Sequence, residues 1–123
     1  ARRRAEAMAD AVIRSDEAEV SRLLGEGVDP DAFIGSGGGT ALFWAAHHGD
    51  VELAALLLDA GADVERGSTR GFTPLMAATL AGQVEMVRLL LEHDADPRAR
   101  NPSGICALDL AGESPDIRAL LER

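Results

Sequence analysis

Two adjacent histidines, His47 and His48, are the first residues whose side chains could do chemistry. Imidazoles bind metals and transfer protons, but a metal site needs several ligands that converge on one point. Neighbouring residues on a helix point about 100° apart, and neither cysteine nor carboxylate stands at ligand spacing from this pair. We therefore interpret the two histidines as solvent-facing side chains on a binding surface, and we expect no metal site.

A glycine-rich run at 35–39 has the composition of a phosphate-binding loop but not its context. Such a loop ends in Lys followed by Ser or Thr and comes after a strand, and both signals are missing here. Ser36 also lacks the glycine two positions earlier that a hydrolase nucleophile requires. The run is interpreted as a flexible connector.

The remaining reactive side chains are equally isolated. Cys106 is the only cysteine, so an internal disulfide is impossible, and we expect a small buried side chain rather than a reactive thiol. Asp29 and Asp31 form a carboxylate pair within a turn that offers no cleft. The sequence thus predicts no catalytic constellation and no cofactor, and we expect a protein that is not an enzyme.

Composition narrows the classes of partner and compartment. The 123 residues fit one domain, and the formal net charge of −9 disfavours nucleic acid and anionic membranes as partners. No apolar run approaches the roughly 18 residues that span a bilayer, and no secretory signal is visible. We expect a monomer in a reducing compartment, the cytoplasm or, in a eukaryote, the nucleus. The first residue is Ala1 rather than Met, which is compatible with a longer parent chain.

The chain nearly repeats itself with a period of about 33 residues, which indicates one supersecondary unit stacked on copies of itself. Matched segments share both residue types and spacing. These pairs are 40–46 with 73–79, Gly49 with Gly82, and 56–58 with 89–91. A stack of this kind buries a shared core and leaves an extended surface free to bind.

Within each central unit the sequence predicts two short helices. Thr40 and Thr73 are suited to cap the first helix of their units, and Pro74 fits the first position after its cap. Gly49 ends one helix, and Asp50 can cap the next. At the end of the third unit Asp94 replaces the glycine found in the first two, which predicts a weaker helix stop.

The two terminal units are degenerate, as end units of a stack are. The first aligns with the second once a single extra residue is allowed in the connector 35–39. The last unit is shorter than the others, so Gly82 has no clear counterpart there. We predict an all-α solenoid of about four helix-turn-helix units joined by hairpin-like loops, forming a single domain over 1–123. The expected units are 1–34, 35–67, 68–100 and 101–123.

Two segments carry a resemblance to a known family. The segment 71–78, followed by Gly82, 87–91 and 95–96, resembles the ankyrin repeat, and so does the stretch from Thr40 to Val64. The resemblance covers nearly the whole chain. The family's histidine after Thr-Pro-Leu is replaced by Phe43, Met76 and Asp109, so we expect a less regular and less stable stack.

This resemblance implies a concave binding face made by the loops and the first helix of each unit. Carried over by position, the candidate partner-binding residues are His47, His48, Arg70, Phe72, Leu80, Ala81, Ser103, Ile105 and Glu113. Phe72 and Arg70 are of the types that most often dominate binding energy. Trp44 stands at an apolar inner-helix position, and we expect it in the core.

Four arginines are also found in the connectors between the expected helices. Arg66, Arg70, Arg98 and Arg100 all lie between helical segments, whereas most acidic residues lie in the helices. Either the arginines form a basic edge that suits an acidic peptide, or they pair with the neighbouring Asp63, Glu65, Asp94 and Asp96.

The expected function is therefore a non-catalytic module that binds a partner protein or peptide on its concave face. Two alternatives remain open: a targeting or regulatory segment of a larger enzyme or transporter, and a stand-alone inhibitor of another protein. A small enzyme with an unrecognised site would instead show a deep pocket with perturbed titratable groups.

Overall fold

The computed structural model describes residues 2–34, 38–112 and 114–122 of the chain. This part contains eight helices and one short hairpin, whose strands β1 (Phe33–Ile34) and β2 (Gly39–Thr40) pair antiparallel. The helices are α1 (Arg2–Ile13), α2 (Glu17–Gly25), α3 (Ala41–His48), α4 (Val51–Asp59), α5 (Pro74–Leu80), α6 (Val84–Glu92), α7 (Ala107–Leu110) and α8 (Pro115–Leu121).

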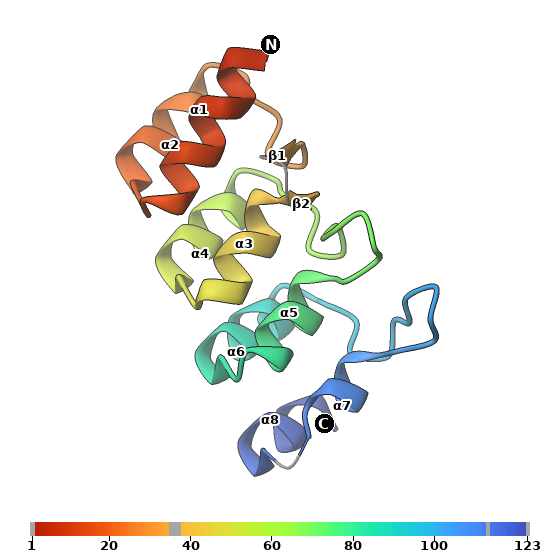
Figure 1. The fold of residues 1–123 in the computed structure, drawn as a ribbon. Helices are drawn as coiled ribbons and strands as arrows, with labels where there is room; N and C mark the ends of the chain where they lie inside the picture. The colour runs from red at the N-terminus through yellow and green to blue at the C-terminus, as the bar shows by residue number, and fades with distance from the viewer. Residues whose placement is uncertain (1, 35–37, 113, 123) are drawn as a thin grey trace.

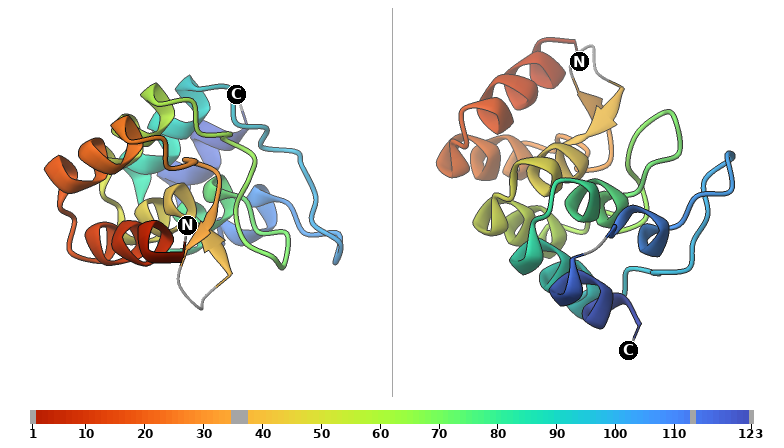
Figure 2. Two further views of the ribbon diagram at one scale, coloured as in Figure 1. Left: turned by 90° about the horizontal axis from the view of Figure 1, so that it is seen from above. Right: turned by 60° about the horizontal axis from the view of Figure 1, so that its bottom comes forward.

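The helices form four antiparallel pairs that are stacked in a row, with the two termini at opposite ends (Figure 1). The first helices of the pairs pack on one another in the order α1, α3, α5, α7, and the second helices in the order α2, α4, α6, α8. Viewed along the stack, the connecting loops project to one side of the helices (Figure 2). The predicted all-α solenoid of helix-turn-helix units is confirmed.

Side-chain caps define where most of these short helices begin. Thr40, Thr73, Asp16 and Asp50 each accept a hydrogen bond from the backbone N–H three residues further on, at 3.1–3.2 Å. Each bond satisfies a donor that the first turn of a helix leaves free. Pro74 follows Thr73 at the first helical position, where its missing N–H costs nothing. The caps predicted at Thr40, Thr73 and Asp50 are confirmed.

The core is a continuous layer of aliphatic side chains between successive pairs. Leu75 is 1% exposed, while Leu90 and Leu57 have no exposed surface. Ala46 and Ala78 are also fully buried, and their small side chains allow the inner helices to approach closely. Cys106 is buried at the start of α7, as expected.

The last pair departs from the others through its shortened inner helix. Helix α7 has four residues, whereas α3 has eight and α5 has seven. Gly112 follows α7 with φ of 58°, as Gly49 and Gly82 follow α3 and α5 with φ of 76° and 73°. The counterpart of Gly82 that sequence alignment did not reveal therefore exists. It is displaced because the helix before it is shorter.

The stop after α6 uses a non-glycine residue in the left-handed region, as the sequence predicted. Asp94 has φ of 68°, whereas the equivalent Gly27 and Gly61 both have φ of 96°. Because a side chain is strained in this region, Asp94→Gly should raise the free energy of unfolding by about 0.5–1 kcal/mol. Urea denaturation of the two proteins measures this difference, and a less stable variant would contradict the expectation.

A buried hydroxyl without a partner lies at the end of α5. Thr79 is 3% exposed, and its Oγ1 makes no hydrogen bond with any residue that the structure describes. The equivalent residue of the preceding unit, Ala46, is apolar and fully buried. Desolvating an unpaired hydroxyl opposes folding, since water would otherwise satisfy it.

We therefore expect Thr79→Val, which keeps the shape and removes the hydroxyl, to raise the free energy of unfolding by about 1 kcal/mol. Thermal and urea melts provide the measurement. Thr73→Val is the opposite control, because the Thr73 hydroxyl accepts the N–H of Met76 at 3.2 Å and its loss should destabilise the protein. A Thr79→Val protein that melts earlier than the parent would show that the hydroxyl is satisfied in solution.

Candidate functional site

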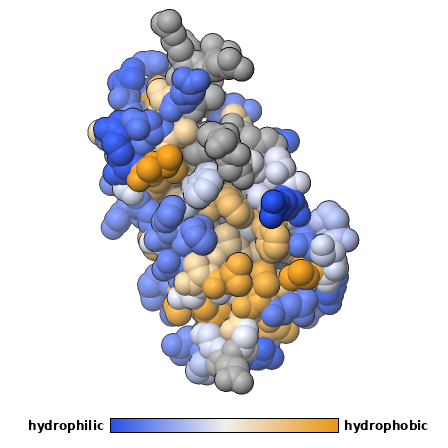
Figure 3. All heavy atoms as spheres, viewed as in Figure 1, coloured by the Kyte–Doolittle hydropathy of each residue, from blue (hydrophilic) through white to orange (hydrophobic). Residues whose placement is uncertain are grey.

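An apolar groove of about 280 Å³ lies in the angle between the inner helices and the loops. Helices α3 and α5 form its floor, and the loop before α5 forms its side. The lining residues are Phe43, Trp44, His47, Phe72, Ala77 and Leu80. On this face of the molecule, apolar side chains gather over α5 and toward α7 (Figure 3).

Helix α3 contributes a cluster of aromatic rings to the groove. Phe43 and Trp44 meet edge to face, with ring centroids 6.1 Å apart. The Trp44 indole stacks on the His48 imidazole one turn later, at 6.0 Å and 16° between the ring planes. The His48 ring in turn meets His47 edge to face at 5.2 Å. These contacts hold the aromatic wall in one arrangement before any partner arrives.

Gly39 makes room for the Phe43 ring. A Cβ atom at Gly39 would lie 2.7 Å from Cδ2 of Phe43, closer than such atoms can approach. The equivalent residue of the next unit is Phe72 itself. In the second unit this position is therefore a glycine, and the Phe43 ring fills the space beside it. In the third unit the same position carries the aromatic side chain of Phe72.

The loop that carries Phe72 is tied by its own backbone. The Ser68 N–H donates to the Phe72 carbonyl at 2.9 Å, and the Ser68 hydroxyl accepts the N–H groups of Arg70 and Phe72 at 3.3 and 3.2 Å. The loop is also joined to the preceding unit, because the Thr40 N–H donates to the Gly67 carbonyl at 3.2 Å. Phe72 is thus held half-buried beside the groove.

Helix α5 supplies the exposed end of the groove. Leu80 is 63% exposed, an unusual state for a leucine on a helix that otherwise buries its side chains. It occupies the inner-helix position that His47 has in the second unit and Ile13 has in the first. Ile13 is 73% exposed, and His47 is exposed as well. One position of each of the first three inner helices is therefore exposed to solvent, and in the second and third helices that position lines the groove.

The structure brings together part of the predicted binding set. His47, Phe72 and Leu80 line the groove. His48, Arg70 and Ala81 are exposed. In the sequence, His48 and Ala81 directly follow lining residues, and Arg70 is two positions before Phe72.

The other predicted residues lie elsewhere. Ser103 and Ile105 belong to the last loop, where the N–H groups of both donate to Oδ1 of Asn101 at 2.9 and 3.0 Å. Neither residue lines the groove. Their loop does contact the loop that carries Phe72, because a Cβ atom at Gly71 would lie 2.5 Å from Cδ of Pro102. Glu113 lies outside the described residues.

Three lining residues were not predicted as part of a site. Trp44 was expected in the core; it does pack against the core, but it is only half-buried and also lines the groove. Phe43 and Ala77 were not singled out either. Ala77 is small and occupies the position that Trp44 has in the preceding unit, so the third unit leaves open the space that an indole would fill. Comparison of side-chain size at equivalent positions is the sequence signal that could have found the groove.

One loop arginine, Arg100, pairs with an acid of helix α7 rather than with an acid of its own loop. Arg100 lies 3.6 Å from the Asp109 carboxylate of α7, and it also donates to the Gly104 carbonyl at 2.6 Å. The backbone N–H of Cys106 donates to Asp109 and lowers the pKa of that carboxyl, with a smaller contribution from Arg100. Arg70 is exposed and forms no ion pair within the described part of the chain.

The carboxylates of two connectors bind backbone amides of the following unit instead. Oδ1 of Asp31 accepts the N–H of Asp63, and Oε2 of Glu65 accepts the N–H of Asp96, both at 2.7 Å. Partial burial raises the pKa of Glu65, an effect that the hydrogen bond from Asp96 partly offsets. These carboxylates join successive units of the stack.

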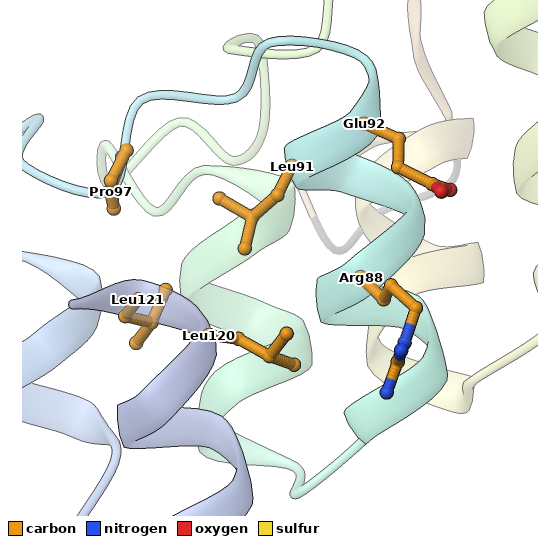
Figure 4. Close-up of a pocket in the computed structure, with 6 residues that line it drawn as sticks. All are labelled: Arg88, Leu91, Glu92, Pro97, Leu120 and Leu121. Carbon is orange, nitrogen blue, oxygen red and sulfur yellow. The ribbon is translucent and has the colours of Figure 1, made fainter. Parts of the chain in front are cut away.

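A second cavity, of about 430 Å³, lies between α6 and α8 (Figure 4). Leu91 on α6 and Pro97 in the following loop lie beside Leu120 and Leu121 on α8. Leu120 and Leu121 are only 7% and 6% exposed. Covering this cavity would remove little of their apolar surface from water, whereas covering Leu80 would remove much more. We therefore place the candidate site at the groove of α3 and α5.

Three carboxylates meet at the starts of two outer helices. Oxygen atoms of Glu17, Asp50 and Glu52 lie within 4.8 Å of one another. Asp50 caps α4 through the N–H of Leu53 at 3.1 Å, and carboxylates are favoured in the first turn of a helix. Helix capping accounts for this cluster.

Comparison with known families agrees with this architecture. A family model described as "Ankyrin repeats (3 copies)" matches residues 8–101, well over half of the chain. Among the described helices, none is both long enough and apolar enough to cross a bilayer. The stacked helix pairs, the projecting loops and this match together show that the chain belongs to the ankyrin repeat family.

Proposed function

We propose that the chain is a non-catalytic recognition module that binds a segment of another protein in the groove of α3 and α5. Ankyrin repeats are in general protein–protein interaction modules. The observation that carries the proposal is the exposure of Leu80 beside Phe72 and Trp44, because an exposed apolar side chain next to half-buried aromatics is typical of binding surfaces. Covering the groove would remove this apolar surface from water.

The preformed groove supports binding more than catalysis. Its rings are held by contacts within α3, so little conformational entropy opposes association. The one cysteine is buried at the start of α7, away from the groove lining. His47 lines the groove, but the lining contains no serine, cysteine or carboxylate for it to activate.

Binding to a partner is expected to depend on Phe72 and Leu80. Phe72→Ala or Leu80→Glu should weaken it by about 2 kcal/mol or more, roughly 30-fold in Kd, because each removes apolar contact at the centre of the surface. The immobilised proteins can be compared for the partners they retain from a cell extract, followed by calorimetry with the purified partner. Circular dichroism checks that helicity is unchanged.

Ile13→Glu is the matched control, because Ile13 is an exposed aliphatic residue at the same inner-helix position but outside the groove lining. It should retain partners that Leu80→Glu loses. If Ile13→Glu and Leu80→Glu lose the same bound partners, capture reflects nonspecific hydrophobic adhesion. Unchanged affinity in Phe72→Ala and Leu80→Glu would place the contact surface elsewhere.

A further inference from the structure

Acidic residues are excluded from the segments that build the groove. The chain has 21 Asp and Glu residues against 12 basic ones. None of these acidic residues falls in 38–48, which contains α3, or in 66–82, which contains the Phe72 loop and α5. The net negative charge of the molecule therefore lies mainly on the outer helices, on the helix starts and in the other connectors.

The charged and polar groups beside the groove are those that attract carboxylates. Arg70 is exposed just before Phe72, and the Ser68 hydroxyl holds the N–H groups of both. Unlike Arg14, which pairs with Asp10 at 2.7 Å, Arg70 forms no ion pair with a described residue. His47 and His48 are exposed on α3 and can donate hydrogen bonds.

The charges closest to the groove decide whether it attracts or repels a charged ligand. At physiological ionic strength the screening length is about 8 Å, so exposed acids on the outer helices act weakly across the stack. Along the chain, Arg70 is the charged residue nearest to the groove lining, two positions before Phe72, and the nearest acid is Asp50, three positions after His47. An anionic group bound on the side of Phe72 is therefore expected to be attracted by Arg70 despite the net charge of −9.

The groove is also small. Its volume of about 280 Å³ lies just below the range of about 300–1,000 Å³ that is typical of small-molecule pockets. It is open to solvent on the side of Leu80, whose side chain is 63% exposed. This space suits one bulky apolar side chain that projects from a peptide lying across the loop and α5.

Resting on the proposed function, we propose that the partner presents a short acidic segment with one bulky apolar residue. The apolar side chain enters the groove between Phe72, Trp44 and Leu80. Neighbouring carboxylates face the Arg70 guanidinium and the imidazoles of α3. The peptide backbone stays at the surface, so the same groove accepts leucine, isoleucine or phenylalanine at the anchoring position.

The test begins with a library of short random peptides displayed on phage, selected on the wild-type protein and depleted on Leu80→Glu. Enriched peptides should combine a bulky apolar residue with adjacent Asp or Glu. Trp44 is the only tryptophan and the chain has no tyrosine, so its fluorescence reports binding of synthetic peptides that lack both residues. Replacing the peptide's carboxylates by amides should weaken binding by about tenfold or more.

Charge reversal on the protein provides the matched comparison. Arg70→Glu should weaken binding of the acidic peptide by about tenfold or more, and it should reduce the salt dependence of binding. Arg88→Glu makes the same change in net charge on the outer helix α6, where Arg88 is 3.8 Å from Glu85, and should change affinity less than about twofold.

The outcomes separate this inference from the proposed function. Enrichment of basic or uncharged peptides that still require Leu80 would overturn the acidic partner and leave the recognition groove in place. A selection that enriches nothing on the wild-type protein relative to Leu80→Glu would contradict both. If Arg70→Glu and Arg88→Glu lose equal affinity for the acidic peptide, the effect is due to the net charge of the protein, and the role of Arg70 is refuted.

Discussion

Leu90→Ala should lower the free energy of unfolding by about 2–5 kcal/mol. Leu90 lies on α6 with no exposed surface, in the core that the stacked helix pairs share. Truncation removes its apolar surface and leaves a cavity that short, capped helices cannot collapse to fill. Leu75→Ala should act similarly, since Leu75 is 1% exposed on α5. Such a loss is a large fraction of the stability of an ordinary domain.

Urea denaturation followed by circular dichroism measures the change. Leu80→Ala is the matched control, because it makes the same chemical change on α5 at a residue that is 63% exposed. It should shift stability by less than about 0.5 kcal/mol. If Leu90→Ala and Leu80→Ala unfold at the same urea concentration, the assignment of Leu90 to the core is wrong.

Gly67→Ala should be the second severe substitution, with a loss of about 2–4 kcal/mol. A Cβ atom at Gly67 would lie 1.8 Å from the carbonyl oxygen of Phe72, which accepts the Ser68 N–H at 2.9 Å. A backbone oxygen cannot rotate away as a side chain can. The loop must therefore open, and the opening also displaces Phe72 from the groove. We expect a lower melting temperature and, in the peptide assay, weakened binding.

Gly25→Ala provides the comparison within the same chain. Gly25 is the last residue of α2, and a Cβ atom there would meet nothing within 4 Å. Alanine is the better helix former, so this variant should gain up to about 1 kcal/mol. A Gly67→Ala protein as stable as Gly25→Ala would show that the loop tolerates a side chain at Gly67 without rearrangement.

Most of the helical architecture could be predicted from the sequence, because each unit carries its own boundary signals. Thr40 and Thr73 cap helices as expected, and Asp94 adopts the left-handed conformation that its alignment with glycine requires. These signals are local, so one sequence is enough to interpret them. The shortened α7 was less predictable, since a deletion can fall in the helix or in the turn, and the placement of Gly112 shows that the deletion falls in the helix.

The candidate site was only partly predictable, because a groove depends on side-chain sizes in two neighbouring units. Phe72 and Leu80 were found by their position in the unit, but the contribution of Trp44 to the groove was not predicted. Its surface position depends on the space that Gly39 leaves for Phe43 and on the stacking of His48. Packing of this kind involves residues from several elements, and periodicity alone does not encode it.

Two carboxylate links fasten the first three helix pairs to one another. Asp31 accepts the backbone N–H of Asp63, and Glu65 accepts that of Asp96. Both links lie beside the pairs that carry the recognition groove, whereas the last pair contains the shortest helix, the four-residue α7. We expect local opening to begin at this last pair while the pairs around the groove stay closed.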